Sequence, residues 1–283
     1  MKKLILTGYL FCLHLLCLPS VAFSEEKPLW ELGAGIAAFD LPHYLGADQS
    51  QTYALPLPYF AYRGSYIRAD RQGIRGMIYN NENLDLRMSL SGSLPVNSKD
   101  NDAREGMDDL ELMLEAGPTL QYTLSRTDHD EWRIDFPVRG AFTAGNEFMR
   151  HQGWIFSPAL HYERDLASGW IVSTNVGPVY TDQRYNAYFY DVDYEDVIAN
   201  RPYFQSSGGF LGSRFSLGLR KEFGEWFVGS FFRYYTLNNS ANEDSPLVKK
   251  DDYVSAGFFV GYVFAESNRR VKDHDRSTNG NGD

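Results

Sequence analysis

Long stretches of this chain alternate between apolar and polar residues with a period of two. The longest runs from Asp109 to Leu124, where every second residue from Leu110 onward is apolar or aromatic. Successive side chains of a β-strand point to opposite faces, so this run predicts one long strand with an apolar face and a polar face. Segments 84–94 and 132–143 repeat the pattern. Secreted sandwiches and transmembrane barrels both show such alternation, so it does not separate the two classes.

The N-terminus favours the barrel because it predicts export. Lys2 and Lys3 precede an apolar run from Leu4 to Leu18, and Ala22-Phe23-Ser24 fits a small-x-small cleavage site. We therefore expect a secretory signal peptide over residues 1–24, with cleavage before Glu25. The alternative is an uncleaved anchor helix, but the run is shorter than the roughly 20 residues that span a bilayer.

Composition excludes several kinds of function. Both cysteines, Cys12 and Cys17, lie in the signal, so the mature chain has no thiol for a disulfide, a metal site or nucleophilic catalysis. The net charge is −10, and the basic surface that nucleic-acid binding requires is absent. No later segment is long and apolar enough for a membrane helix, as expected of a barrel.

Period-two segments separated by turn residues predict an all-β, antiparallel, up-and-down transmembrane barrel of the outer-membrane type, over residues 25–264. We count about twelve strands, with ten as the alternative, and the connections between them alternate between tight and long, as in outer-membrane barrels. The long connections are expected near 40–51, 95–108, 144–152, 182–206 and 237–252. The expected strands are 29–39, 52–62, 65–70, 73–80, 84–94, 109–124, 132–143, 153–164, 170–181, 207–221, 225–236 and 253–264.

Three further patterns refine this barrel. Prolines inside strand segments cannot donate to the ladder, so we expect bulges at Pro56, Pro58, Pro118, Pro137, Pro158 and Pro178. Residues 265–283 are polar and rich in Gly and Asn, which predicts a disordered C-terminal tail. Aromatic residues near strand ends are typical of interfacial girdles, with core packing as the alternative. They are Trp30, Tyr59, Tyr62, Tyr66, Trp132, Trp154, Trp170, Trp226, Tyr234, Tyr235 and Tyr262.

Four short blocks stand out along the chain. They are Tyr44-Leu45-Gly46-Ala47-Asp48 with Leu55-Pro56-Leu57-Pro58, then Gly106-Met107-Asp108-Asp109, then the segment from Val176 to Tyr185, and finally Asp244-Ser245-Pro246-Leu247-Val248. In this order they resemble the sequence blocks of the MipA/OmpV family, the MltA-interacting outer-membrane proteins. The resemblance implies an outer-membrane barrel. It also implies a scaffold that links a lytic transglycosylase with a penicillin-binding synthase in peptidoglycan enlargement, although other members are described as porin-like proteins or adhesins. Members usually end at the terminal aromatic residue, whereas this chain continues past Phe264.

The sequence offers little catalytic chemistry. No mature histidine has metal-type spacing to another ligand, and no cofactor motif is present. Ser157, His161 and Glu163 share one face of a predicted strand, but three polar residues on a lumen face are ordinary in a barrel. We therefore expect a protein that is not an enzyme and binds no metal or cofactor.

Charged residues on the polar face are expected to point into the lumen. Their mixed signs favour ion pairs that fill the interior, and a charge-lined solute path is the alternative. They are Asp85, Arg87, Glu111, Glu115, Arg133, Asp135, Arg139, Glu163, Arg214, Arg220 and Arg233. The long loop 185–204 either folds inward as a plug or presents its rings to a partner. Those rings are Tyr185, Tyr188, Phe189, Tyr190, Tyr194, Tyr203 and Phe204.

Together these features predict an outer-membrane β-barrel of a Gram-negative bacterium, embedded in outer-membrane lipid. The function we expect is that of a scaffold for peptidoglycan synthase and hydrolase proteins. A narrow porin-like channel for small solutes, or an adhesin that uses acidic extracellular loops, are the alternatives.

Overall fold

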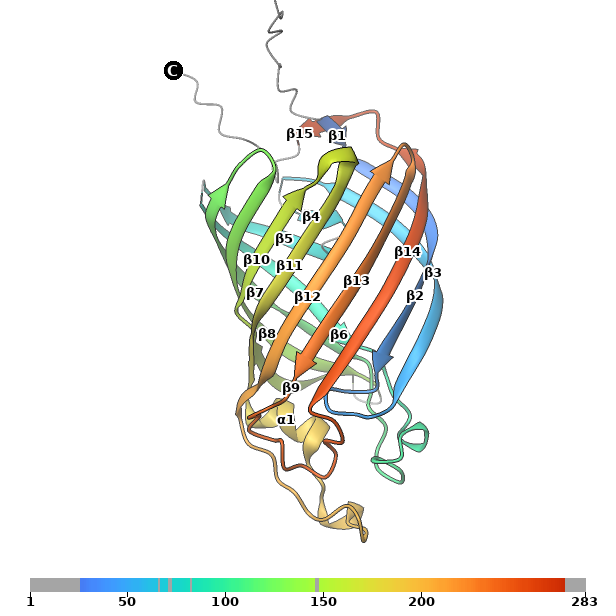
Figure 1. Cartoon of the computed structure of the whole chain (residues 1–283), viewed down its shortest axis with the longest axis vertical. Coiled ribbons are helices and arrows are strands. Elements are labelled where there is room, and N and C mark those ends of the chain that lie inside the picture. Colours follow the sequence, from blue (N-terminus) through green and yellow to red (C-terminus); the bar gives the residue numbers. More distant parts are fainter. Residues whose placement is uncertain (1–25, 66, 71–72, 82, 146–147, 273–283) are drawn as a thin grey trace, which may run out of the picture.

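The computed structural model describes residues 26–65, 67–70, 73–81, 83–145 and 148–272, and the expected signal peptide lies outside them. One antiparallel sheet dominates the chain (Figure 1). Its strands are β2 (Trp30–Pro42), β3 (Ser50–Arg63), β4 (Ile67–Asp70), β5 (Gly73–Asn80), β6 (Leu84–Ser93), β7 (Met113–Arg126), β8 (Asp130–Ala144), β9 (Phe148–Phe156), β10 (Ala159–Asp165), β11 (Trp170–Thr181), β12 (Gly209–Phe223), β13 (Trp226–Thr236) and β14 (Asp252–Glu266).

The sheet closes on itself into an up-and-down barrel. β14 pairs with β2, and β9 and β10 lie end to end, because both pair with β8 and with β11. Counting β9 and β10 as one interrupted strand, the wall of the barrel has twelve strands. The predicted architecture is confirmed.

The apolar face of the strands points outward. On β7, Leu114 and Leu120 expose 43% and 38% of their surface, whereas Glu115 and Thr119 expose only 7% and 6%. Such an arrangement places hydrocarbon-compatible side chains on the outside and polar ones in the lumen, as a membrane barrel requires. No helix in the described part of the chain is long and apolar enough to cross a membrane.

Short turns gather at one end of the barrel and long loops at the other (Figure 1). Outer-membrane barrels keep short turns in the periplasm and long loops outside, so we call the two ends the periplasmic and the extracellular end. Two boundaries differ from expectation. Strand β7 begins at Met113 rather than Asp109, and Leu110 is buried in a loop, where it bridges Val96. The expected long connection 144–152 is mostly strand, since β9 begins at Phe148.

The prolines affect the sheet unequally. Pro158 interrupts the strand between β9 and β10, and a register shift follows Pro178. Pro56 and Pro58 cause no shift at all, because β2 and β3 stay in register from Trp30 to Ser50. The expected bulges at Pro56 and Pro58 are therefore wrong.

The wall is incomplete between β3 and β6. β3 pairs with β4 only through Tyr62 and Arg63, and the β4–β5 hairpin turns back after Asp70. β5 reaches no further along β6 than Met88, so Ser89–Ser93 has no partner on that side among the described residues. We call this gap at the extracellular half of the barrel the wall opening.

The described chain beyond Phe264 includes strand residues as far as Lys272, where a disordered tail was expected. β14 continues to Glu266, and β15 (Arg270–Lys272) pairs with β1 (Glu26–Pro28) at the periplasmic end. Residues 273–283 lie outside the described part. The girdle prediction also needs correction at Tyr59 and Tyr235, whose rings lie inside against Phe227 and Tyr253. Tyr66 lies outside the described residues.

Candidate functional site

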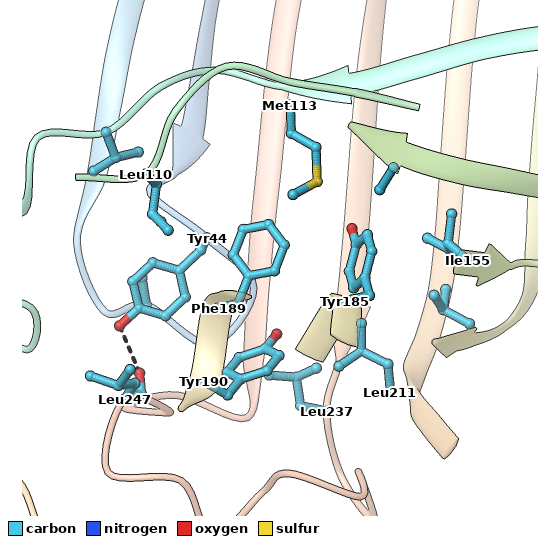
Figure 2. Packing of buried hydrophobic residues seen from close by; sticks show 14 of the residues in the cluster. Tyr44, Leu110, Met113, Ile155, Tyr185, Phe189, Tyr190, Leu211, Leu237 and Leu247 are labelled. Carbon is cyan, nitrogen blue, oxygen red and sulfur yellow. Dashed lines mark hydrogen bonds between the residues drawn. The ribbon is translucent and has the colours of Figure 1, made fainter. Parts of the chain in front are cut away.

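Four long connections fold together over the extracellular mouth of the barrel. Residues 43–49, 94–112, 182–208 and 237–251 form this structure, which we call the loop cap. Its apolar core includes Tyr44, Leu110, Phe189, Tyr190 and Leu247, and Figure 2 shows Phe189 between Tyr44 and Tyr185. Rings and aliphatic side chains from loops far apart in the sequence are thus buried against one another, which stabilises the closed mouth.

Hydrogen bonds between the loops fix this arrangement. Tyr44 donates to the carbonyl oxygen of Leu247 at 2.7 Å, and Tyr190 donates to that of Leu45 at 3.0 Å. Ser245 in turn donates to the carbonyl oxygen of Tyr190 at 2.8 Å. Each bond satisfies a backbone acceptor that would otherwise be buried without a partner.

A short helix carries the rings into the cap. α1 (Gln183–Tyr190) begins after Asp182, whose carboxylate accepts the backbone N–H groups of Tyr185 and Trp154 at 2.9 and 3.0 Å. A side chain at Gly153 would collide with that carboxylate, so only glycine allows this close approach. The cap is therefore anchored directly to β9.

The rings of the aromatic loop 185–204 lie in two different environments. Tyr185, Phe189 and Tyr190 are buried in the cap, whereas Tyr188 and Phe204 are partly buried against it. Tyr194 is 82% exposed and stacks on Tyr203 with ring centroids 4.5 Å apart. The helix thus lies buried in the loop cap, and the stacked pair of Tyr194 and Tyr203 lies outside the core of the cap.

Burial also sets the ionisation of the cap tyrosines. Loss of solvent raises the pKa of Tyr44, Tyr185 and Tyr190, and the nearby Glu115 carboxylate raises that of Tyr185 further. All three hydroxyls therefore remain protonated donors at physiological pH. Tyr185 uses its proton to bond Glu115 at 3.2 Å.

A cavity of about 440 Å³ lies beneath the cap, and we call it the cap cavity. Its charged lining consists of Glu115, Arg139, Arg214 and Arg233, and its roof includes Tyr185, Phe189 and Tyr190. Arg139 bonds Glu115 at 3.2 Å. The lining therefore carries more positive than negative charge.

A second cavity of about 480 Å³ lies nearer the periplasmic end, and we call it the lower cavity. Its charges are mostly paired. Arg133 contacts Glu131 and Asp135 at 2.8 and 3.0 Å, and Arg220 contacts Glu163 at 3.0 Å. Arg139, Arg214 and Arg233 line both cavities and so lie between them.

The predicted lumen charges are mostly in the lumen. The exception is Glu111, which lies in the loop cap, where its backbone N–H donates to the Tyr188 hydroxyl oxygen at 2.7 Å. Asp85 and Arg87 are buried and contact each other at 2.9 Å. Sequence reasoning missed Glu131 and Tyr253. Glu131 is the second residue of β8, beside a turn, and Tyr253 is one of several aromatic residues of β14. The sequence pattern therefore distinguishes neither residue from its neighbours.

The residues considered for catalysis do not form a relay. Ser157 accepts a hydrogen bond from Arg139 at 3.5 Å, and the His161 ring nitrogen Nδ1 contacts Asn175 at 3.0 Å. Glu163 accepts from Arg220. No group of three or more His, Asp, Glu or Cys side chains within the described ranges could hold a metal ion.

The family model of the MltA-interacting protein MipA matches residues 32–264. The chain belongs to the MipA family. In this MipA-family chain, the four blocks that resemble the family converge on one region. Tyr44, Tyr185 and Leu247 meet in the core of the loop cap, and Met107 packs against that core. Pro56 and Pro58 of the first block lie instead on the wall opening.

Solved structures similar to this MipA-family chain are outer-membrane proteins. An outer-membrane channel from Pseudomonas putida F1 has a TM-score of 0.38 and 12% identity, and the match covers 86% of this chain and 98% of that one. A Pseudomonas aeruginosa FadL homologue has a TM-score of 0.35 and 8% identity, and the match covers 83% of this chain and 90% of that one. Outer-membrane phospholipase A from Escherichia coli has a TM-score of 0.32 and 13% identity, and the match covers 84% of this chain and 94% of that one. At these scores the likeness carries no argument about function, and no curated protein sequence matches the chain.

Proposed function

We propose that this protein is a closed barrel of the outer membrane that acts as an interaction protein, holding a lytic transglycosylase and a penicillin-binding synthase together at its periplasmic end. The observation that carries the proposal is the loop cap, whose packed apolar core closes the extracellular mouth. A mouth filled in this way opposes steady solute flow. The name of the family supports a partner among peptidoglycan hydrolases.

The periplasmic end offers a surface for such partners. β1 and β15 form a separate two-stranded sheet there, and no third strand of the described residues pairs with it. Free strand edges accept an extended segment of another protein by β-augmentation. We therefore place the docking surface on this sheet and the neighbouring turns.

Affinity capture tests the proposal. The immobilised barrel is expected to retain a periplasmic lytic transglycosylase, and Val271→Pro is expected to weaken capture because it removes a backbone donor opposite Lys27. Tyr194→Ala, on the extracellular side, is the control and is expected to leave capture unchanged. Absence of capture by the wild-type barrel would contradict the scaffold role.

Planar-bilayer recording tests the closed state. The wild-type barrel is expected to show little steady conductance. If the lumen were a solute channel, a stable current would appear, and Arg139→Glu would shift its preference toward cations because it reverses the charge between the two cavities. A current of that kind contradicts a purely scaffolding barrel.

A further inference from the structure

The wall opening is a built feature of the barrel. Along β3, residues 50–58 pair with β2 on one side, and no described strand pairs with them on the other. Pro56 and Pro58 lie within this stretch and have the same parity, so their nitrogens face the same side of the strand. Because the register with β2 is unbroken, both nitrogens face the opening, where no ladder donor is needed. The sequence itself thus marks β3 as an edge.

An open edge at this position needs an occupant. Unpaired backbone groups are not tolerated in contact with the hydrocarbon of a bilayer, unless they line a cavity or are covered. The lining of the cap cavity includes Tyr53 of β3 and Ser91, Gly92 and Ser93 of β6, and these two strands form the two rims of the opening. The edge therefore borders the cavity, and the cavity reaches the wall at the level of the extracellular half of the barrel.

The floor of the cap cavity presents donors that lack acceptors. Arg214 pairs in register with Tyr235, and Arg233 lies two residues earlier on β13, so the two arginines are diagonal neighbours on the lumen face. Neither forms an ion pair with a carboxylate of the described residues, and Glu115, which also lines the cavity, is engaged by Arg139. The Nε atom of Arg233 and the hydroxyl of Tyr253 are buried without a hydrogen-bond partner. Buried donors of this kind favour an anionic acceptor.

Much of the remaining lining is apolar. Leu41, Ile155, Val179 and Phe189 contribute to the walls and roof of the cavity, whose volume of about 440 Å³ is that of a small-molecule site. Positive charge therefore lies at the floor and apolar surface lies above it.

We propose that the cap cavity binds an anionic amphiphile, with a carboxylate or phosphate head on Arg214, Arg233 and Tyr253 and an apolar chain toward the wall, and that this ligand enters from the outer leaflet through the wall opening. The proposal is independent of the scaffold role. The lower cavity shares Arg214 and Arg233 but lacks Tyr253 and the apolar roof, and its own arginines Arg133 and Arg220 are held by carboxylates.

Equilibrium binding of dodecanoate and dodecan-1-ol to the barrel in lipid discs tests the head-group chemistry, with empty discs as background. Dodecanoate is expected to bind the wild-type barrel at least tenfold more tightly than the alcohol. The double variant Arg214→Gln/Arg233→Gln is expected to lose that difference, whereas Arg220→Gln on the same strand β12 keeps it. Heat-modifiable gel mobility verifies that each variant is folded. Equal dodecanoate affinity in the double variant and the wild type would overturn the proposal, as would no binding to the wild type.

Blocking the opening tests the route. The mature chain has no cysteine, so Ser91→Cys can be labelled with a bulky maleimide at the rim, and Ser230→Cys on the outer face of β13 serves as the matched control. The label at residue 91 is expected to slow dodecanoate association at least tenfold, and the label at residue 230 is expected to leave it unchanged. Unchanged association with residue 91 labelled would overturn entry through the wall.

Discussion

The two halves of the lumen use the same residue types in opposite ways. In the lower cavity, arginines and carboxylates stand in pairs, with Arg133 held by both Glu131 and Asp135. The lining of the cap cavity has three arginines and one carboxylate, Glu115, which pairs with Arg139. Paired charges satisfy one another and fill space, whereas unpaired donors leave binding capacity unused. The difference separates a structural half of the barrel from a half that can receive a ligand.

Removing an arginine from each half gives the sharpest test of this difference. Arg133→Met leaves the largely buried Asp135 without an ion-pair partner and leaves Glu131 with Arg126 alone, so we expect it to lower the free energy of unfolding by about 3 kcal/mol. Arg214→Met removes a charge with no described ion-pair partner and is expected to cost less than about 1 kcal/mol. Urea unfolding in lipid vesicles measures both. Equal losses would mean that the charges of the two halves do not differ in this way.

The bond between the cap and Glu115 is the next target. Tyr185→Phe removes a buried hydrogen bond to a charged acceptor, and we expect a loss of about 2 kcal/mol in the free energy of unfolding. Tyr194→Phe, at an 82% exposed ring, is the control and is expected to have no measurable effect. Protease sensitivity of the loop cap reports local opening. A cap equally resistant in wild type and Tyr185→Phe would contradict the anchoring role.

Alkaline pH provides a graded test of the same contact. The pKa of Tyr185 is raised in the folded state, so the folded protein binds this proton more tightly than the unfolded chain. The contribution of Tyr185 is therefore fully present below the unfolded pKa of about 10, and it is lost as pH rises from there toward the folded pKa. We expect the loop cap to become protease-sensitive above about pH 10, and less steeply so in Tyr185→Phe. A cap whose sensitivity is independent of pH would contradict this assignment.

The smallest change in the free energy of unfolding is expected for an exposed ion pair. Arg270 contacts Glu266 at 2.7 Å at the periplasmic end, with both side chains nearly half exposed. Solvent screens such pairs, so Arg270→Gln is expected to change the free energy of unfolding by less than about 0.5 kcal/mol. A loss comparable to that of Arg133→Met would show that burial does not explain the ranking.

The sequence predicts the wall better than the cap, for a physical reason. Each strand faces lipid on one side, so its period of two is strict, and the strand count, the facing of Glu115 and the split at Asp70 could all be predicted. Loops bury residues against each other without any period. Leu110 fits the alternation of β7 although it lies in a loop, so the predicted strand begins too early.

The sequence also does not predict the wall opening or the ion-pair partners of the arginines in the lumen. Pro56 and Pro58 marked a strand that tolerates missing donors, but a bulge and an open edge satisfy that condition equally. Only the short β4–β5 hairpin decides between them. Likewise, Arg133 and Arg214 are the same residue type on the same lumen face. Whether each has a partner depends on strand register, which alternation does not fix.

The pairing of β1 with β15 has a consequence for how quickly the barrel comes apart. These strands are the two ends of the described chain, and they lie beside the seam where β14 meets β2 (Figure 1). Once that seam has formed, the ends are already neighbours, so joining them costs little additional loop entropy. In the reverse direction, a barrel that opens at its seam has to separate β1 from β15 as well. The pairing of β1 with β15 thus acts on the rate of unfolding more than on the final fold, and it slows the loss of the folded barrel.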